Sequence, residues 1–267
     1  MDGPELTQFF ECHDIVRINA TAPLSERDVT DDLKQLEAHW EALERGEEGA
    51  VHEVRKLSRQ AGAVLGALEA PKKIQRAWRA LRRAIAPMRD WDVLRDLLRS
   101  RLDELEVPLE TLRKFEEDWQ LEREKRFGYL VLPAKPHSFD TPKHFDKLLE
   151  EALEDEWPKL RRTAKRILSL EPSALWHDWR KKLKHYRYLL EALDRDSTDL
   201  RAVLQSLGRV QDAEVLICTL EDPLQLPSLA PELREKVTQL ERGAMLEAAE
   251  KVRSSWAQLK DAGGGVV

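Results

Sequence analysis

The sequence contains few glycines and cysteines for its length of 267 residues. It has 11 glycines, and no G-x-G-x-x-G or G-x-x-x-x-G-K-[ST] pattern is present, which excludes the usual glycine-rich loops that hold nucleotide phosphates. The two cysteines, Cys12 and Cys218, supply neither a disulfide framework nor a four-cysteine zinc site. We therefore expect a protein of a reducing, cytoplasmic compartment.

Long apolar runs and strand-forming residues are scarce as well. No stretch of 18 or more apolar residues occurs, so no transmembrane helix is predicted and no membrane partner is expected. The first 20 residues carry four carboxylates and lack the basic and then apolar pattern of a signal peptide. Leu, Glu, Arg, Ala and Lys dominate over Val, Ile and Thr, which favours helix over strand. We predict an all-α fold.

Charge alternates strongly along the chain. The formal net charge of −6 combines acidic segments at residues 1–51 (−9), 102–157 (−8) and 188–267 (−5) with two basic segments, 52–101 and 158–187, of +8 each. A nearby anion responds to the local charge, because salt screens charges beyond about 10 Å. The basic segments either neutralise acidic helices within the protein or face an anionic ligand, and composition leaves both possibilities open.

Prolines mark the boundary between two halves. Three of them lie within residues 129–145, where they disfavour helix and indicate a connector. His137 and His144, within it, are expected to be exposed. We predict an N-terminal extension (1–28), a first helical bundle (29–128), the connector (129–145) and a second bundle (146–267).

Two segments of the first half recur in the second half in the same order. Residues 51–59 (VHEVRKLSR) align with 176–184 (WHDWRKKLK), and both fit H-x-x-R-K-x-x-[RK]. Residues 88–94 (MRDWDVL) align with 210–216 (VQDAEVL). Two ordered matches at nearly one offset favour an internal duplication. We predict two pseudo-symmetric antiparallel helical bundles.

Apolar periodicity and proline positions predict the helices individually. Pro158 suits a helix start, Gly208 a helix end, and Asp90 and Asp212 suit N-caps. The predicted helices are Val29–Arg45, Gly49–Leu68, Lys72–Ala86, Asp90–Arg101, Leu105–Phe127, Pro142–Trp157, Pro158–Ser169, Ser173–Leu193, Leu200–Gly208, Asp212–Thr219 and Pro231–Lys260.

Each of the two histidine-containing helices carries a cationic stripe opposite its apolar face. The stripes consist of His52, Arg55, Lys56 and Arg59, and of His177, Arg180, Lys181 and Lys184. No carboxylate lies four residues from the arginines and lysines of either stripe, and like charges at this spacing repel. We expect both stripes to point away from the core, toward an acidic helix or an extended polyanion.

Further basic residues extend these stripes. Arginine suits phosphoryl oxygens because its planar donors bind them in pairs, and lysine adds mobile charge. The additional candidate ligand-binding residues are Arg76, Arg79, Arg82, Arg83 and Arg89 in the first half and Arg161, Arg162, Lys165, Arg166 and Arg187 in the second.

At these residues the chain resembles the CHAD family, the conserved histidine α-helical domain. The first copy of the pattern is His52, Arg55, Lys56 and Arg59 followed by residues 89–94 (RDWDVL), and the second is His177, Arg180, Lys181 and Lys184 followed by 207–216 (LGRVQDAEVL). The second copy departs from the pattern at Gln211, which replaces an arginine. The resemblance implies two helical bundles related by approximate two-fold symmetry with a basic surface or pore between them, binding of inorganic polyphosphate, and association with polyphosphate granules.

The same residues also bear on other functions. No H-E-x-x-H motif, acidic metal cluster or nucleophile–base arrangement accompanies the stripes, so we expect no catalytic residues, no metal and no cofactor. A phosphoanhydride hydrolase is thus disfavoured. A nucleic-acid binder would need aromatic side chains for stacking on bases, and the stripes lack them. A generic polyanion or nucleic-acid binder and a protein-interaction scaffold with internally neutralised helices remain as alternatives to polyphosphate binding.

Overall fold

The computed structural model describes residues 29–222, 225–226 and 228–261. Within these ranges it contains nine α-helices and no strand, which confirms the all-α prediction. The predicted N-terminal extension, 1–28, and Cys12 lie outside the described residues. No helix in the described ranges is both long and apolar enough to cross a membrane. In the segment between α5 and α6, His137 and His144 are exposed as expected.

The helices agree with most of the predicted spans. The helices are α1 (Val29–Glu44), α2 (Glu48–Ala67), α3 (Lys72–Ala84), α4 (Ala86–Glu104), α5 (Leu109–Gly128), α6 (Phe145–Ile167), α7 (Ala174–Ala192), α8 (Thr198–Glu221) and α9 (Pro231–Asp261).

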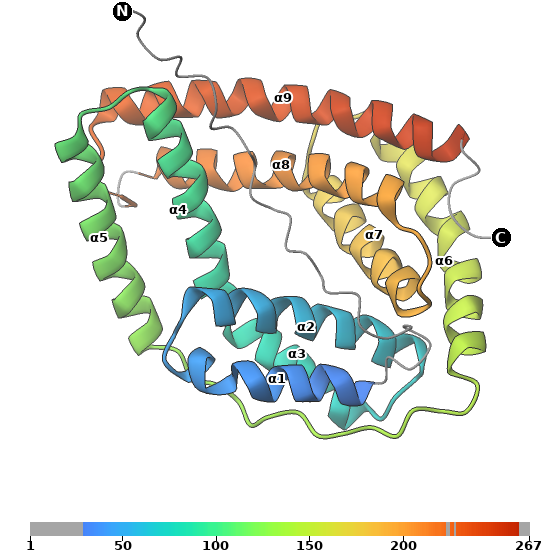
Figure 1. Cartoon of the computed structure of the whole chain (residues 1–267). Coiled ribbons are helices and arrows are strands. Elements are labelled where there is room, and N and C mark those ends of the chain that lie inside the picture. The colour runs from blue at the N-terminus through green and yellow to red at the C-terminus, as the bar shows by residue number, and fades with distance from the viewer. Residues whose placement is uncertain (1–28, 223–224, 227, 262–267) are drawn as a thin grey trace, which may run out of the picture.

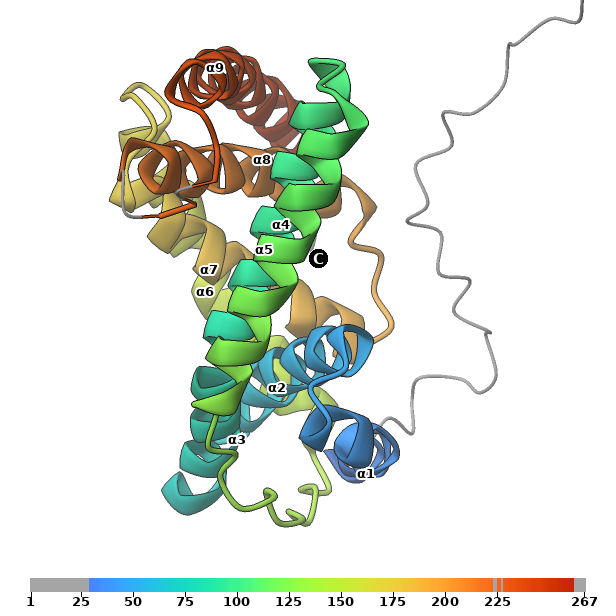
Figure 2. The ribbon, with the colours of Figure 1, turned by 90° about the vertical axis from the view of Figure 1, so that its left-hand side faces the viewer.

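The helices form a frame that is seen in Figure 1. The long helices α8 and α9 lie side by side along its upper edge, and α1 and α2 lie along its lower edge with α3 behind them. The α4–α5 hairpin closes one side and α6 and α7 close the other; in Figure 2 the α4–α5 hairpin stands in front of α7 and α8. Across the frame, α2 packs against α7 and α4 packs against α8.

Apolar stripes at helical spacing explain this packing. In α2, Val51, Val54 and Leu57 are buried, and in α7 Trp176 and Trp179 are buried as well, each on the face predicted for the core. Burying one such aliphatic or aromatic side chain contributes about 2 kcal/mol. The main core therefore includes side chains of both α2 and α7, which pack against each other.

Two hydrophobic cores form, and the main one draws on both halves of the chain. It contains residues of α1, α2 and α3 together with residues of α6, α7, α8 and α9. The smaller core lies between the α4–α5 hairpin and α8 and α9, where Trp91 stacks on Trp119 with ring centroids 3.9 Å apart. The predicted domain boundaries and the duplication remain predictions.

Two pairs of predicted helices are single helices, so these predictions were wrong. Gly208 lies inside α8 and Pro158 lies inside α6. For α8 the reason is a close approach of another side chain: a Cβ atom at Gly208 would lie only 3.2 Å from Nη2 of Arg180. The glycine therefore serves side-chain packing within a continuous helix rather than a helix end.

The N-cap predictions for Asp90 and Asp212 were also wrong. Helix α4 begins four residues earlier, at Ala86, with a proline in its first turn, and Asp212 lies well inside α8. Neither carboxylate therefore caps a helix end. Both face basic side chains of α2 or α7 instead, as described below.

Candidate functional site

Basic side chains from four helices converge where α2 packs against α7. They are Arg55 and Arg59 of α2, Arg82 of α3, Arg89 of α4, and Arg180, Lys184 and Arg187 of α7, and we call these seven residues the central cluster. All seven are half-buried. The sequence predicted that the stripes lie opposite the apolar faces of α2 and α7, and the stripe residues of the central cluster do so. They are half-buried between helices, because α2 and α7 pack on each other.

The positive charge of Arg59 acts on four other cations of the central cluster. Its charge lowers the pKa of Arg55, Arg82, Arg180 and Lys184, which lie on three different helices. Within the described residues Arg59 has no carboxylate within ion-pair distance and no hydrogen-bond partner. The repulsion around Arg59 is therefore not offset by a direct ion pair of its own.

Lys184 is the cation that this environment affects most clearly. Burial, followed by the charges of Arg180, Arg59 and Arg187, lowers its pKa from 10.5 to about 7. Burial is also the main cause of the lowered pKa of Arg55, which falls to about 10. A bound polyanion would act in the opposite direction and favour the charged form of Lys184.

Only three carboxylates lie near the seven cations among the described residues, and one of them, Glu191, lies 3.7 Å from Nε of Arg187. Asp90 accepts a hydrogen bond from Nη2 of Arg55 at 2.8 Å. Asp212 is half-buried; burial raises its pKa, whereas the charges of Arg180 and Lys184 lower it. Positive charge therefore exceeds negative charge in the central cluster, which favours an anionic ligand.

Three buried guanidinium nitrogen atoms in the central cluster lack a hydrogen-bond acceptor. Nη1 of Arg55, Nε of Arg180 and Nε of Arg187 are shielded from solvent, and no acceptor among the described residues forms a hydrogen bond with any of them. A buried donor without a partner is costly, especially on a charged group. Phosphoryl oxygens would supply the acceptors that arginine binds most readily.

Helix α3 continues the positive charge outward from the central cluster. The charges of Arg79 and Arg83 lower the pKa of Arg82, and all three belong to one helix that contains no carboxylate. Arg76, Arg79 and Arg83 are exposed, while Trp78 and Leu81 of the same helix are buried. This basic face therefore connects the central cluster with solvent.

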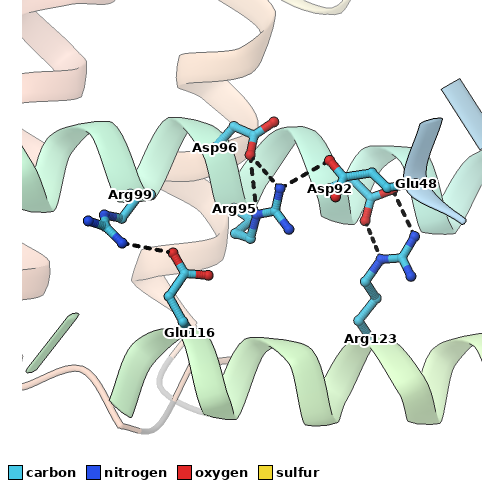
Figure 3. A network of polar contacts seen from close by, with 7 residues as sticks. All are labelled: Glu48, Asp92, Arg95, Asp96, Arg99, Glu116 and Arg123. Carbon is cyan, nitrogen blue, oxygen red and sulfur yellow. Dashed lines mark hydrogen bonds and ion pairs between the residues drawn. The ribbon is translucent and has the colours of Figure 1, made fainter. Parts of the chain in front are cut away.

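Further along α4, by contrast, acidic partners neutralise Arg95 and Arg99 (Figure 3). Arg95 pairs with Glu48 at 3.0 Å, and Arg99 pairs with Glu116 at 3.2 Å. The buried Arg123 of α5 donates to Asp92 at 2.6 Å and to the carbonyl oxygen of Gly46 at 2.9 Å. Internal neutralisation, the alternative left open by the sequence, therefore applies to α4 and α5.

Four residues of the predicted stripes lie outside the central cluster. His52 and Lys56 are exposed, and Glu53 lies 3.8 Å and 3.4 Å from them, respectively. Lys181 pairs with Asp178 at 3.0 Å, another carboxylate three residues away. The sequence prediction took into account only carboxylates four residues away, whereas these partners lie one or three residues away. The fourth, His177, lines a separate cavity.

The basic residues of α6 are also separate from the central cluster. Arg161, Arg162, Lys165 and Arg166 are exposed on α6, which packs against α7 with its opposite face. The charges with the strongest effects on the pKa values of the central cluster come from α2, α3, α4, α7 and α8, and none comes from α6. The structure therefore divides the predicted binding residues into two surfaces.

A cavity of about 620 Å³ adjoins the central cluster between α4 and α8. Asp90, Trp91, His177 and Gln211 are among its lining residues. Burial and then the charge of Lys181 lower the pKa of His177, while a hydrogen bond with Gln211 raises it. The two predicted histidines thus lie in different environments, since His52 is exposed.

The described residues contain no group of three or more histidine, cysteine or carboxylate side chains arranged to bind a metal ion. Sequence reasoning missed the roles of Asp90, Asp212 and Gly208. All three residues lie within or beside the repeated segments, which was the available sequence signal. Their roles could not be predicted from it, because they depend on which helix faces them.

Comparison with known proteins identifies the class of this protein. The family model of the CHAD domain matches residues 27–196, and the chain belongs to the CHAD family. Among solved structures, PptA from Streptomyces chartreusis is similar to this chain, with a TM-score of 0.57, 15% identity, and coverage of 86% of this chain and 96% of that chain. This likeness supports the all-helical fold. No curated protein sequence matches the chain.

Proposed function

We propose that this protein binds inorganic polyphosphate through the central cluster and the exposed face of α3, without cleaving it. The observation that carries the proposal is the half-buried excess of positive charge between α2 and α7, where Arg59, Arg180 and Lys184 have no carboxylate within ion-pair distance among the described residues. Membership of the CHAD family supports the same ligand, because the family pattern implies polyphosphate binding.

The chemistry of the central cluster supports binding rather than catalysis. Arginine side chains dominate it, and arginine stays protonated and offers donors in pairs to phosphoryl oxygens. The carboxylates Asp90 and Asp212 are directed at these cations, which leaves neither free to activate a nucleophile. On this proposal the protein locates in the cytoplasm on polyphosphate granules.

A titration with long-chain polyphosphate and with duplex DNA, each at low and physiological salt, tests the proposal. We expect salt-sensitive binding of polyphosphate, recovery of the polymer at its original length, and weak binding of DNA. Arg59→Gln with Arg180→Gln is expected to reduce polyphosphate affinity at least tenfold. Arg113→Gln with Lys114→Gln, on the exposed face of α5, is the matched control and is expected to leave affinity unchanged.

Two outcomes would contradict the proposal. Equal affinity for DNA and polyphosphate would make the central cluster a generic polyanion site. Undiminished polyphosphate binding by the Arg59 and Arg180 variant, with the helical content intact, would place the ligand elsewhere.

A further inference from the structure

The outer face of α6 presents four cations within six residues. Arg161, Arg162, Lys165 and Arg166 are all exposed, and within the described part of the chain none of them forms an ion pair. At 100° per residue they cover one side of the helix, opposite the buried Leu160. They extend about 8 Å along the helix axis.

Stability of the helix does not explain this arrangement. Arg161 with Lys165, and Arg162 with Arg166, are like-charge pairs four residues apart, a spacing that destabilises a helix. The helix dipole favours the cations of the last turn, Lys165 and Arg166, but its effect decays within that turn and does not reach Arg161. By contrast, Lys159, which lies two residues before Arg161, has a carboxylate partner, Asp155, at 2.5 Å.

We propose that this outer face of α6 is a second polyphosphate-binding surface, which engages a distant stretch of a long chain already held in the central cluster. The inference rests on the proposed function. The two surfaces are separated by the packed interface of α6 with α7, so one short oligophosphate cannot occupy both. A long, flexible chain can, and its second contact is then intramolecular, which raises its affinity without new contacts in the central cluster.

Exposed guanidinium and ammonium groups suit this role. A flexible polyanion requires no fixed geometry of its partner, and each neutralised phosphate releases counterions whatever the exact contact. The central cluster, with its half-buried arginines, would fix the position of the chain. The outer face would then supply affinity that depends on chain length and on salt.

The test compares tripolyphosphate with long-chain polyphosphate as ligands. The outer-face variant is Arg161→Gln, Arg162→Gln, Lys165→Gln and Arg166→Gln. Its matched control removes four exposed lysines from α5 and α9, Lys114, Lys125, Lys236 and Lys251, by the same substitution. Both variants change the net charge equally, and circular dichroism checks that both fold.

We expect the outer-face variant to bind tripolyphosphate as the unchanged protein does and to bind the long chain at least about tenfold more weakly. Its slope of log affinity against log salt is expected to be smaller by about 3, corresponding to four lost contacts. Long-chain binding equal to that of the control variant would overturn the inference. If the unchanged protein binds neither ligand, the proposed function itself fails; if only the outer-face result fails, the central cluster stands as the whole site.

Discussion

Lys184 shows how one side chain can link ligand binding to protons. It lies among Arg180, Arg187 and Arg59, with Asp212 of α8 as the nearby carboxylate, and its pKa of about 7 leaves it largely neutral in mildly alkaline solution. A polyanion stabilises the protonated form, so binding is expected to take up a proton.

The expected result is a polyphosphate affinity that falls between pH 6.5 and pH 8.5. Calorimetric titrations in two buffers of different ionisation enthalpy would measure the proton uptake, which should be largest above about pH 7. Lys184→Arg, which stays protonated, is expected to bind with little pH dependence. The same pH dependence in that variant would assign the linkage to another group.

The stability of the free protein responds to Lys184 in the opposite direction. The folded pKa is about 7 and the unfolded value is 10.5, so between these values the unfolded chain binds more protons than the folded one. The contribution of Lys184 to the free energy of unfolding therefore increases as pH rises through this window. Comparing melting temperatures of the protein and of Lys184→Met at pH 7 and pH 9 would isolate this contribution.

At the level of single elements, α8 depends on Gly208 for its approach to α7. A Cβ atom at this position would lie 3.2 Å from Nη2 of Arg180, closer than side chains normally pack. Alanine favours helix over glycine by about 1 kcal/mol. We expect Gly208→Ala to displace the Arg180 guanidinium and lower polyphosphate affinity several-fold, while the melting temperature stays equal or rises. A parallel loss of stability and affinity would show that the substitution disrupts the α7–α8 packing instead.

The ion pair that joins α4 to α5 is expected to have only a structural role. Asp92 is fully buried against Arg123, and removing one partner of such a pair leaves an uncompensated buried charge. Asp92→Asn should therefore lower the free energy of unfolding by about 3 kcal/mol. Titration at a temperature where the variant is folded should give unchanged polyphosphate affinity; a large loss would connect the α4–α5 hairpin with the binding site.

The sequence predicted the elements better than their ends. Periodicity identified the apolar faces of α2 and α7, because burial on one side of a helix leaves a repeating pattern. It divided α8 at Gly208, since a glycine that makes room for a distant arginine has the same local signature as one that ends a helix. The candidate site was predicted as residue types, but its geometry depends on which helices face each other.

Separation of the basic residues into two surfaces could not be predicted for the same reason. Arg82 and Arg162 belong to similar basic segments of the sequence, yet Arg82 lies in the central cluster and Arg162 on the outer face of α6. The difference arises from long-range packing, which one sequence without its fold does not specify.

On the scale of the whole molecule, salt should act on stability and on binding in opposite ways. Arg59 contributes repulsion without an ion pair of its own, so Arg59→Gln should raise the free energy of unfolding of the free protein, by about 1 kcal/mol at low salt. High salt screens the repulsion and should shrink this difference. Polyphosphate binding should weaken with salt. Chemical denaturation of both proteins at two NaCl concentrations measures the effect; a less stable variant at low salt would show that Arg59 stabilises the fold.

Helix α8 supplies side chains to both hydrophobic cores, with Leu204 in the main core and Leu216 in the smaller one. Because one continuous helix contributes to both cores, we expect the two cores to unfold together as one cooperative unit. Amide protons in the middle of α8 should then be the slowest to exchange with deuterium, at the rate of global unfolding. A ligand held beside that helix would protect the whole molecule from unfolding, and not only the helices that touch it.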